Sequence, residues 1–233
     1  MSDKHLSTQF DSELATASSR VMELGGLVES EIKEAVAALS DYSIEGVHRV
    51  LEIEQQVNAL ELEIDREISN IIGRRQPTAR DLRLLMAISK TTANLERVGD
   101  EAAKMARMVR SIIDGGTPYS LPSYELNVAV ELASKLLRKA LDAFARLDTA
   151  AALSILKEDD MIDKEFDGFT RKLITYMMED PRTISASLDL LFLAKAVERI
   201  GDHAKNIAEF IIYVVKGADV RHQSLEEIES VLQ

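Results

Sequence analysis

Four acidic residues in the first half of the chain are spaced in a way that suits metal binding. Glu61 and Asp65 lie four residues apart, and so do Glu96 and Asp100. Residues four apart in an α-helix project from the same face, so each pair presents two carboxylates together. Two such helices side by side would offer a metal ion a set of ligands made of oxygen atoms only. Mg²⁺, Ca²⁺ and Mn²⁺ favour such a set, and iron also binds in carboxylate-rich helical bundles.

The same pattern returns in the second half of the chain. The pentapeptide Glu-Arg-Val-Gly-Asp at 96–100 matches Glu-Arg-Ile-Gly-Asp at 198–202, which begins 102 residues later. The register persists to Gly115 and Gly217, as expected for an internal duplication. The same separation applied to the other acidic pair completes a second set of four candidate metal ligands: Asp163, Asp167, Glu198 and Asp202.

These acids lie on helix faces that should otherwise be apolar. Glu54 and Glu61 both fall on the apolar stripe of their helix, and Glu31 interrupts the stripe of the helix before it. Buried carboxylates lose hydration and raise one another's pKa, so protons, arginines or metal ions must compensate. Arg97 and Arg199 are poorly placed for this, because each directly follows a glutamate and points about 100° away from it.

Two plainer interpretations stay open. An acidic pair at this spacing usually forms a solvated helix face. Gly99 and Gly201, which lie between the paired acids, suit close helix packing as well as they suit room for an ion. The duplication favours a metal site or a water-filled polar groove over a solvated face.

Apolar residues recur with helical spacing along most of the chain, and four prolines separate the helical stretches. The pattern predicts an all-α fold of six long antiparallel helices in two tandem three-helix bundles, at 1–116 and 117–233. We expect one helix up to the break at 41–43 and one from there to Gly73. The other four are expected at 81–113, 124–147, 149–178 and 183–216.

The composition excludes several classes of function. Cysteine is absent, which removes disulfide scaffolds, thiolate nucleophiles and cysteine-ligated metal sites, and suits a reducing cytoplasm. The formal net charge of −12 disfavours nucleic acid and anionic lipid as partners. No apolar run approaches the roughly 20 residues of a spanning helix, and no signal peptide is evident. We expect a soluble, cytoplasmic protein.

No catalytic constellation accompanies the acids. The chain lacks a glycine-rich phosphate loop, a Gly-x-Ser-x-Gly elbow and the Glu-x-x-His pairs of di-iron oxidases. The four histidines show no ligand spacing and are interpreted as surface residues. No arginine cluster is visible, so phosphate is expected to bind only through metal. The sequence therefore predicts a protein that is not an enzyme.

Several segments resemble the PhoU family of phosphate-transport regulators: the two pentapeptides, RRQPTARDLRLLMAISK at 74–90 and TYMMEDPRTI at 175–184. The resemblance spans essentially the whole chain. It implies paired E/D-x-x-x-D motifs that bind metal ions or multinuclear clusters, and all eight acids match them. The metal stays open among divalent or trivalent ions (Mg, Mn, Fe or Zn). The counterpart of Glu61 is an aspartate, Asp163, and this difference is expected to make the two sites unequal.

The resemblance also implies a regulatory function. Members of the family are often homodimers, and they repress the phosphate-starvation response and restrain phosphate uptake. They act as adaptors between the ATPase subunit of a phosphate ABC transporter and a membrane sensor histidine kinase, and reach the membrane only through these partners. Two alternatives stay open: a metal-dependent phosphoester hydrolase that uses the carboxylates to activate water, and a helical scaffold without metal.

Overall fold

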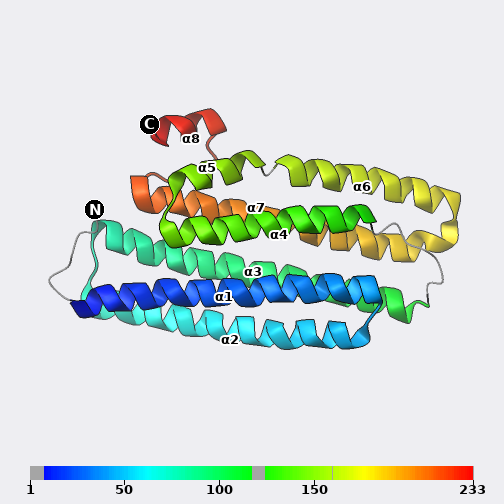
Figure 1. Ribbon diagram of the computed structural model, residues 1–233, viewed down its shortest axis with the longest axis horizontal. Helices are drawn as coiled ribbons and strands as arrows, with labels where there is room; N and C mark the ends of the chain where they lie inside the picture. The colour runs from blue at the N-terminus through cyan, green and yellow to red at the C-terminus, as the bar shows by residue number, and fades with distance from the viewer. Residues whose placement is uncertain (1–7, 117–123, 159, 233) are drawn as a thin grey trace.

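The computed structural model describes residues 8–116, 124–158 and 160–232, and every regular element in these ranges is helical (Figure 1). The predicted all-α fold is confirmed. The elements are α1 (Thr8–Asp41), α2 (Ile44–Arg75), α3 (Ala79–Asp114), α4 (Tyr124–Arg146), α5 (Thr149–Glu158), α6 (Asp160–Glu179), the short 3-10 helix η1 (Pro181–Thr183), α7 (Ile184–Lys216) and α8 (Leu225–Leu232).

The long helices form two bundles that lie along each other. α1, α2 and α3 pack together as one bundle, and α4 to α7 form the second. The chain runs back and forth along the long axis of the molecule (Figure 1). α3 packs against α7 more extensively than any other pair of helices, and α1 contacts α4. The two bundles therefore share a long seam. In the second bundle, α5 and α6 together occupy the place of the fifth predicted helix.

Some predicted features differ from the structure or fall outside it. The helix predicted at 149–178 corresponds to α5 and α6 on either side of residue 159, which lies outside the described residues. The predicted boundary at 116/117 adjoins 117–123, also outside them, and stays a prediction. α8, which packs on α5 and α7, was not predicted. The other helix limits agree to within about two residues, the usual uncertainty of helix ends.

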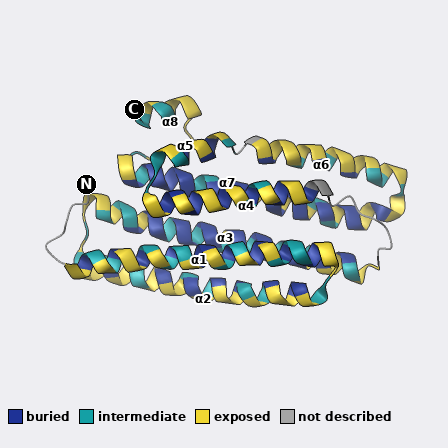
Figure 2. Cartoon of the chain, viewed as in Figure 1, coloured by how far each residue is buried: buried dark blue, intermediate teal, exposed yellow. Residues whose placement is uncertain are grey.

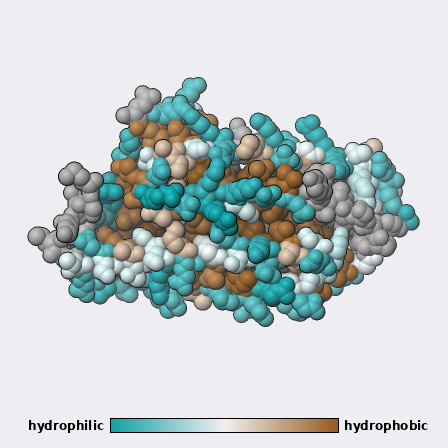
Figure 3. Space-filling view, viewed as in Figure 1, coloured by the Kyte–Doolittle hydropathy of each residue, from teal (hydrophilic) through white to brown (hydrophobic). Residues whose placement is uncertain are grey.

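One apolar core runs through both bundles. Each long helix turns its buried residues inward and its exposed residues outward (Figure 2), and the buried apolar residues form a single cluster. Hydrophilic side chains cover much of the visible surface, with apolar side chains showing between the helices (Figure 3). Among the described helices, none combines the length and the apolar character needed to cross a membrane.

Gly25 marks a close approach between the bundles. A Cβ at this position would lie 2.8 Å from both Cδ atoms of Leu141 in α4, whereas a Cβ at Gly26 would meet nothing within 4 Å. Alanine gains about 1 kcal/mol of helix propensity over glycine at either position, but overpacking typically costs about 1–3 kcal/mol. We expect Gly25→Ala to be about 1–2 kcal/mol less stable than Gly26→Ala in urea unfolding. Equal stability of the two variants would contradict the close approach.

Candidate functional site

The four predicted acids of the first bundle, Glu61, Asp65, Glu96 and Asp100, lie where α2 and α3 pack together, and we call them the first acidic set. Asp65 is exposed and accepts a hydrogen bond of 3.2 Å from Ser89 Oγ of α3, while the other three are half-buried. Burial raises the pKa of Glu61, and the charges of Asp65 and Asp100 raise it further. Burial likewise raises the pKa of Glu96, followed by the charges of Asp100 and Glu61. The structure thus brings the four acids together.

Two further glutamates extend this set into the core. Glu31 of α1 is fully buried, and Glu54 of α2 is 8% exposed. No donor group of the described residues reaches either carboxylate oxygen of Glu31 or Oε2 of Glu54. Burial raises the pKa of Glu31 to about 10, with further contributions from Glu54 and Asp100. Glu31 is therefore protonated at neutral pH, and its proton can be shared with the carboxylate of Glu54.

Gly99 provides the space that these two carboxyl groups occupy. A Cβ at this position would lie 2.9 Å from Oε2 of Glu31 and 3.1 Å from Oε2 of Glu54. The atoms nearest to it belong to side chains, not to the backbone of a neighbouring helix. The glycine within the α3 pentapeptide therefore makes room for carboxyl groups from α1 and α2.

The sequence contained a signal for Glu31 and Glu54, although neither was included among the candidate ligands. Each is a single acid on an apolar stripe, outside any Glu-x-x-x-Asp pair. That pattern could have identified them as buried acids. Their approach to Asp100 depends on how α1 packs on α2 and α3, which helical periodicity does not specify.

The second acidic set, Asp163, Asp167, Glu198 and Asp202, is more exposed than the first. Glu198 is half-buried with Lys195 Nζ 2.6 Å from its carboxylate, and the other three residues are exposed. The position 102 residues after Glu54 holds the buried Leu156, so no acid extends this set inward there. The two sets therefore differ in depth and in local charge, beyond the single Glu-to-Asp difference in the sequence.

The donor chemistry of the first acidic set fits a hard cation. The set offers only oxygen atoms, and neighbouring carboxylates raise the pKa of Glu61 and of Glu96, a repulsion that a bound cation would relieve. As the side chains stand, no group of three acidic or histidine residues in the described part of the chain is arranged to hold a metal ion. Binding would require carboxylates to turn toward one another, and the metal role of all eight acids stays a prediction.

A cleft of about 780 Å³ opens on the seam between α3 and α7 and reaches the segment that follows α7. Glu101 of α3 lines it and is only 5% exposed. Its carboxylate accepts hydrogen bonds from Lys104 Nζ at 2.7 Å and from Arg199 Nη1 of α7 at 3.0 Å. Arg199 thus neutralises an acid of the other bundle, consistent with its predicted direction away from Glu198.

The interpretation of every histidine as a surface residue is wrong for His203. This residue lines the cleft half-buried, with Nδ1 2.9 Å from Oδ1 of Asn94. Burial, and then the charge of Arg97, lower its pKa to about 4, so the neutral imidazole donates through Nδ1 to Asn94. His48 and His222 are exposed as expected, and His5 lies outside the described residues.

The expected absence of an arginine cluster also does not hold in three dimensions. Arg97 of α3, Arg199 of α7 and Arg221 after α7 all line the same cleft. They are far apart in the sequence, and the antiparallel packing of α3 on α7 brings the first two together. The signal lay in the repeat itself, since Arg97 and Arg199 occupy equivalent positions.

Comparisons with known proteins agree on one family. A family model described as "PhoU domain" matches residues 21–109 and 126–211, one range in each bundle. A phosphate-specific transport system accessory protein PhoU homolog of Burkholderia sp is 50% identical, over 98% of this chain and 97% of that protein. The accessory protein PhoU of Escherichia coli K12 is 43% identical, over 99% and 95%. The crystal structure of PhoU from Pseudomonas aeruginosa aligns with a TM-score of 0.85 at 44% identity, covering 90% of this chain and 100% of that chain.

Proposed function

Because the chain belongs to the PhoU family, we propose that it is a negative regulator of the phosphate-starvation response and of phosphate uptake. It acts as a metal-binding adaptor in the cytoplasm. Membership of the family makes the chain an accessory, regulatory protein of phosphate transport. Our proposal adds the direction of regulation, the metal and the partners.

The proposed partners are the ATPase subunit of a phosphate ABC transporter and a membrane sensor histidine kinase. Support comes from the relatives, which are named for phosphate-specific transport. The net charge of −12 suits encounter with basic faces on such partners, an attraction that weakens with salt. A homodimer would present each of these surfaces twice, and the chain would reach the membrane only through its partners.

The metal part of the proposal is supported by the carboxylates gathered in the first bundle, which are buried or half-buried except for Asp65. Glu31, Glu54 and the first acidic set are drawn from all three helices of that bundle. A bound cation would supply the positive charge that their desolvated oxygens lack. The same charge would couple metal occupancy to the packing of α1 on α2 and α3. The adaptor would then have a metal-bound and a metal-free state that its partners could distinguish.

Deletion of the gene tests the regulatory direction. We expect a deletion strain to express starvation genes in high phosphate, and plasmid-borne wild-type chain to restore repression. The measurement is a reporter fused to a starvation promoter, with the empty plasmid as control. Full repression in the deletion strain would show that the chain is not the negative regulator.

A further inference from the structure

The cleft between α3 and α7 contains an arginine that no side chain in the described part of the chain holds by a hydrogen bond or an ion pair. Arg97 lines the cleft and makes no hydrogen bond or ion pair there. Its repeat counterpart, Arg199, lines the same cleft and binds Glu101 at 3.0 Å. Two equivalent arginines therefore have different surroundings.

This difference follows from one exchange between the repeats. The residue 102 positions after Glu101 is His203, so a histidine stands where the second repeat would have the equivalent acid. α3 and α7 run in opposite directions along the seam (Figure 1), and the contact of Arg199 with Glu101 therefore has a pseudo-symmetric counterpart, Arg97 beside His203. An imidazole is neutral or positive at ordinary pH, so Arg97 lacks the carboxylate across the seam that Arg199 has in Glu101.

The rest of the cleft carries charges of both signs. Four more cationic side chains line it: Lys104, Arg199, Lys205 and Arg221. Among the lining acids, Glu101 is already held by two of these cations, and burial raises the pKa of Glu209. Asp100 and Asp202, from the two acidic sets, complete the charged lining. Outside this lining, Asp219 binds the guanidinium of Arg221, so the cations with least carboxylate charge around them are Arg97 and the pair that shares Glu101.

We propose that this cleft binds a small polyvalent oxyanion, with one phosphoryl or carboxylate group seated against Arg97 in the place of the acid that His203 replaces. The guanidinium group binds such oxyanions bidentately. The volume of about 780 Å³ lies within the range of roughly 300–1,000 Å³ typical of ligand sites, so there is room for a molecule of nucleotide size. Lys104 and Arg199 share the single carboxylate of Glu101, so a ligand seated against Arg97 would also meet the charge that this one acid leaves uncompensated.

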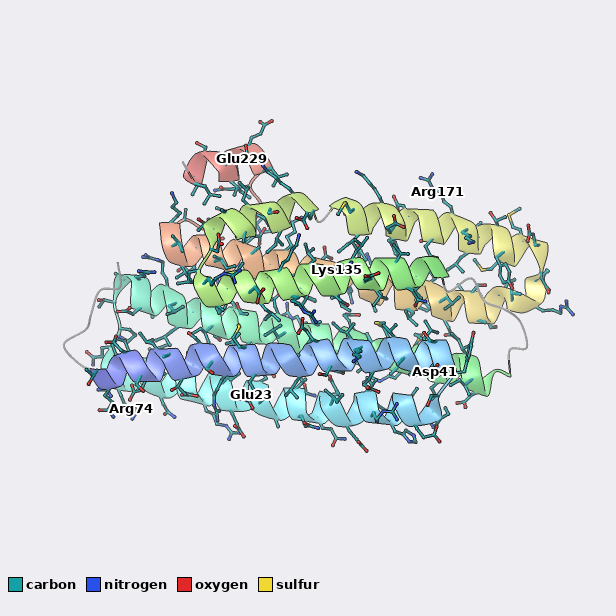
Figure 4. The ribbon with its side chains drawn as sticks, viewed as in Figure 1. Glu23, Asp41, Arg74, Lys135, Arg171 and Glu229 are labelled. Atoms are coloured by element: carbon teal, nitrogen blue, oxygen red, sulfur yellow. The ribbon has the colours of Figure 1, made fainter. Side chains whose placement is uncertain are left out.

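Calorimetric titration of EDTA-treated protein at low, fixed ionic strength tests this proposal with three probes. Pyrophosphate and citrate separate a phosphoryl from a carboxylate ligand, and ATP tests the size of the site. We expect at least one probe to bind the wild type and Arg97→Ala to weaken that binding at least tenfold. Arg171→Ala is the matched control, because it removes an exposed arginine that points outward from α6 (Figure 4); its affinity should equal that of the wild type.

A second variant tests the argument from the repeat. His203→Glu restores the acid of the other repeat, and we expect it to weaken binding at least tenfold while Arg97 stays in place. The proposal is overturned if no probe binds the wild type, if Arg97→Ala binds as the wild type does, or if Arg171→Ala loses as much affinity. If circular dichroism shows His203→Glu to be unfolded, the comparison of the two arginine variants decides. Because the protein is free of metal, the result is independent of the proposed regulatory function.

Discussion

Replacement of Glu31 by glutamine is expected to raise the unfolding free energy of the metal-free protein by about 3 kcal/mol at pH 7. Glu31 is fully buried, receives no hydrogen bond on either oxygen from a donor group of the described residues, and has a pKa raised to about 10. An unfolded glutamate ionises near 4.5. Folding at pH 7 must therefore protonate Glu31, and each pH unit between 4.5 and 7 costs about 1.4 kcal/mol. Glutamine keeps the shape of the side chain and needs no proton.

The expected gain depends on pH in a defined direction. Below the unfolded pKa, Glu31 is protonated in both the folded and the unfolded state and costs no stability. As the pH rises from the unfolded pKa toward the folded pKa, only the unfolded state ionises, so the folded protein loses stability with each pH unit. The advantage of Glu31→Gln should therefore be small near pH 4.5 and grow toward pH 9. Urea unfolding in EDTA at pH 4.5, 7 and 9 measures it. Glu23→Gln, an exposed change on the same helix (Figure 4), should shift stability by less than about 0.5 kcal/mol. A gain at Glu31 that does not vary with pH would contradict the burial of an ionisable group.

Neutralisation of the first acidic set is expected to reduce metal affinity far more than the same change in the second. The double variant Glu61→Gln with Glu96→Gln removes one proposed ligand charge from each of two facing helices. Loss of supporting groups around a metal typically lowers affinity about 10–100-fold, and loss of two ligands should lower it by about 100-fold or more. Titration of Mn²⁺ into EDTA-treated protein, followed by calorimetry, measures the change.

The matched control is Asp163→Asn with Asp167→Asn, which neutralises two exposed acids of α6. We expect a loss of less than about tenfold, because solvent already screens these carboxylates. An equal or larger loss in the second set would contradict the ranking of the two sites. Unchanged Mn²⁺ affinity in the first double variant would remove the first acidic set as a metal site.

Most of the fold could be predicted from the sequence because amphipathic stripes determine both helix position and inward face. The stripe of α1, for example, turns Val21 and Val28 into the core as expected. α8 was missed because it is short, eight residues with only Ile228 buried, so its position depends on tertiary packing. Residue 159 and the linker expected around Pro118 and Pro122 lie outside the described residues.

The candidate site could be predicted only where it depends on spacing within a helix. The first acidic set came from pairs four residues apart, a distance that any helix turns into proximity. Glu31 and the Glu101–Arg199 pair depend on which helices pack together and in what register, and a single periodic sequence does not specify these. The repeat did contain the relevant clue, since Glu101 and His203 are equivalent positions with different chemistry.

We propose that a cation held by the first acidic set keeps the chain in a form that represses the starvation genes. The most direct measurement is reporter output from a starvation promoter, in high phosphate, in a deletion strain. That strain would carry the wild type, the Glu61→Gln, Glu96→Gln variant or the Asp163→Asn, Asp167→Asn variant at equal protein levels. We predict that the wild type silences the reporter and that the first double variant leaves it on. Silencing by the first double variant as complete as by the wild type would contradict the claim.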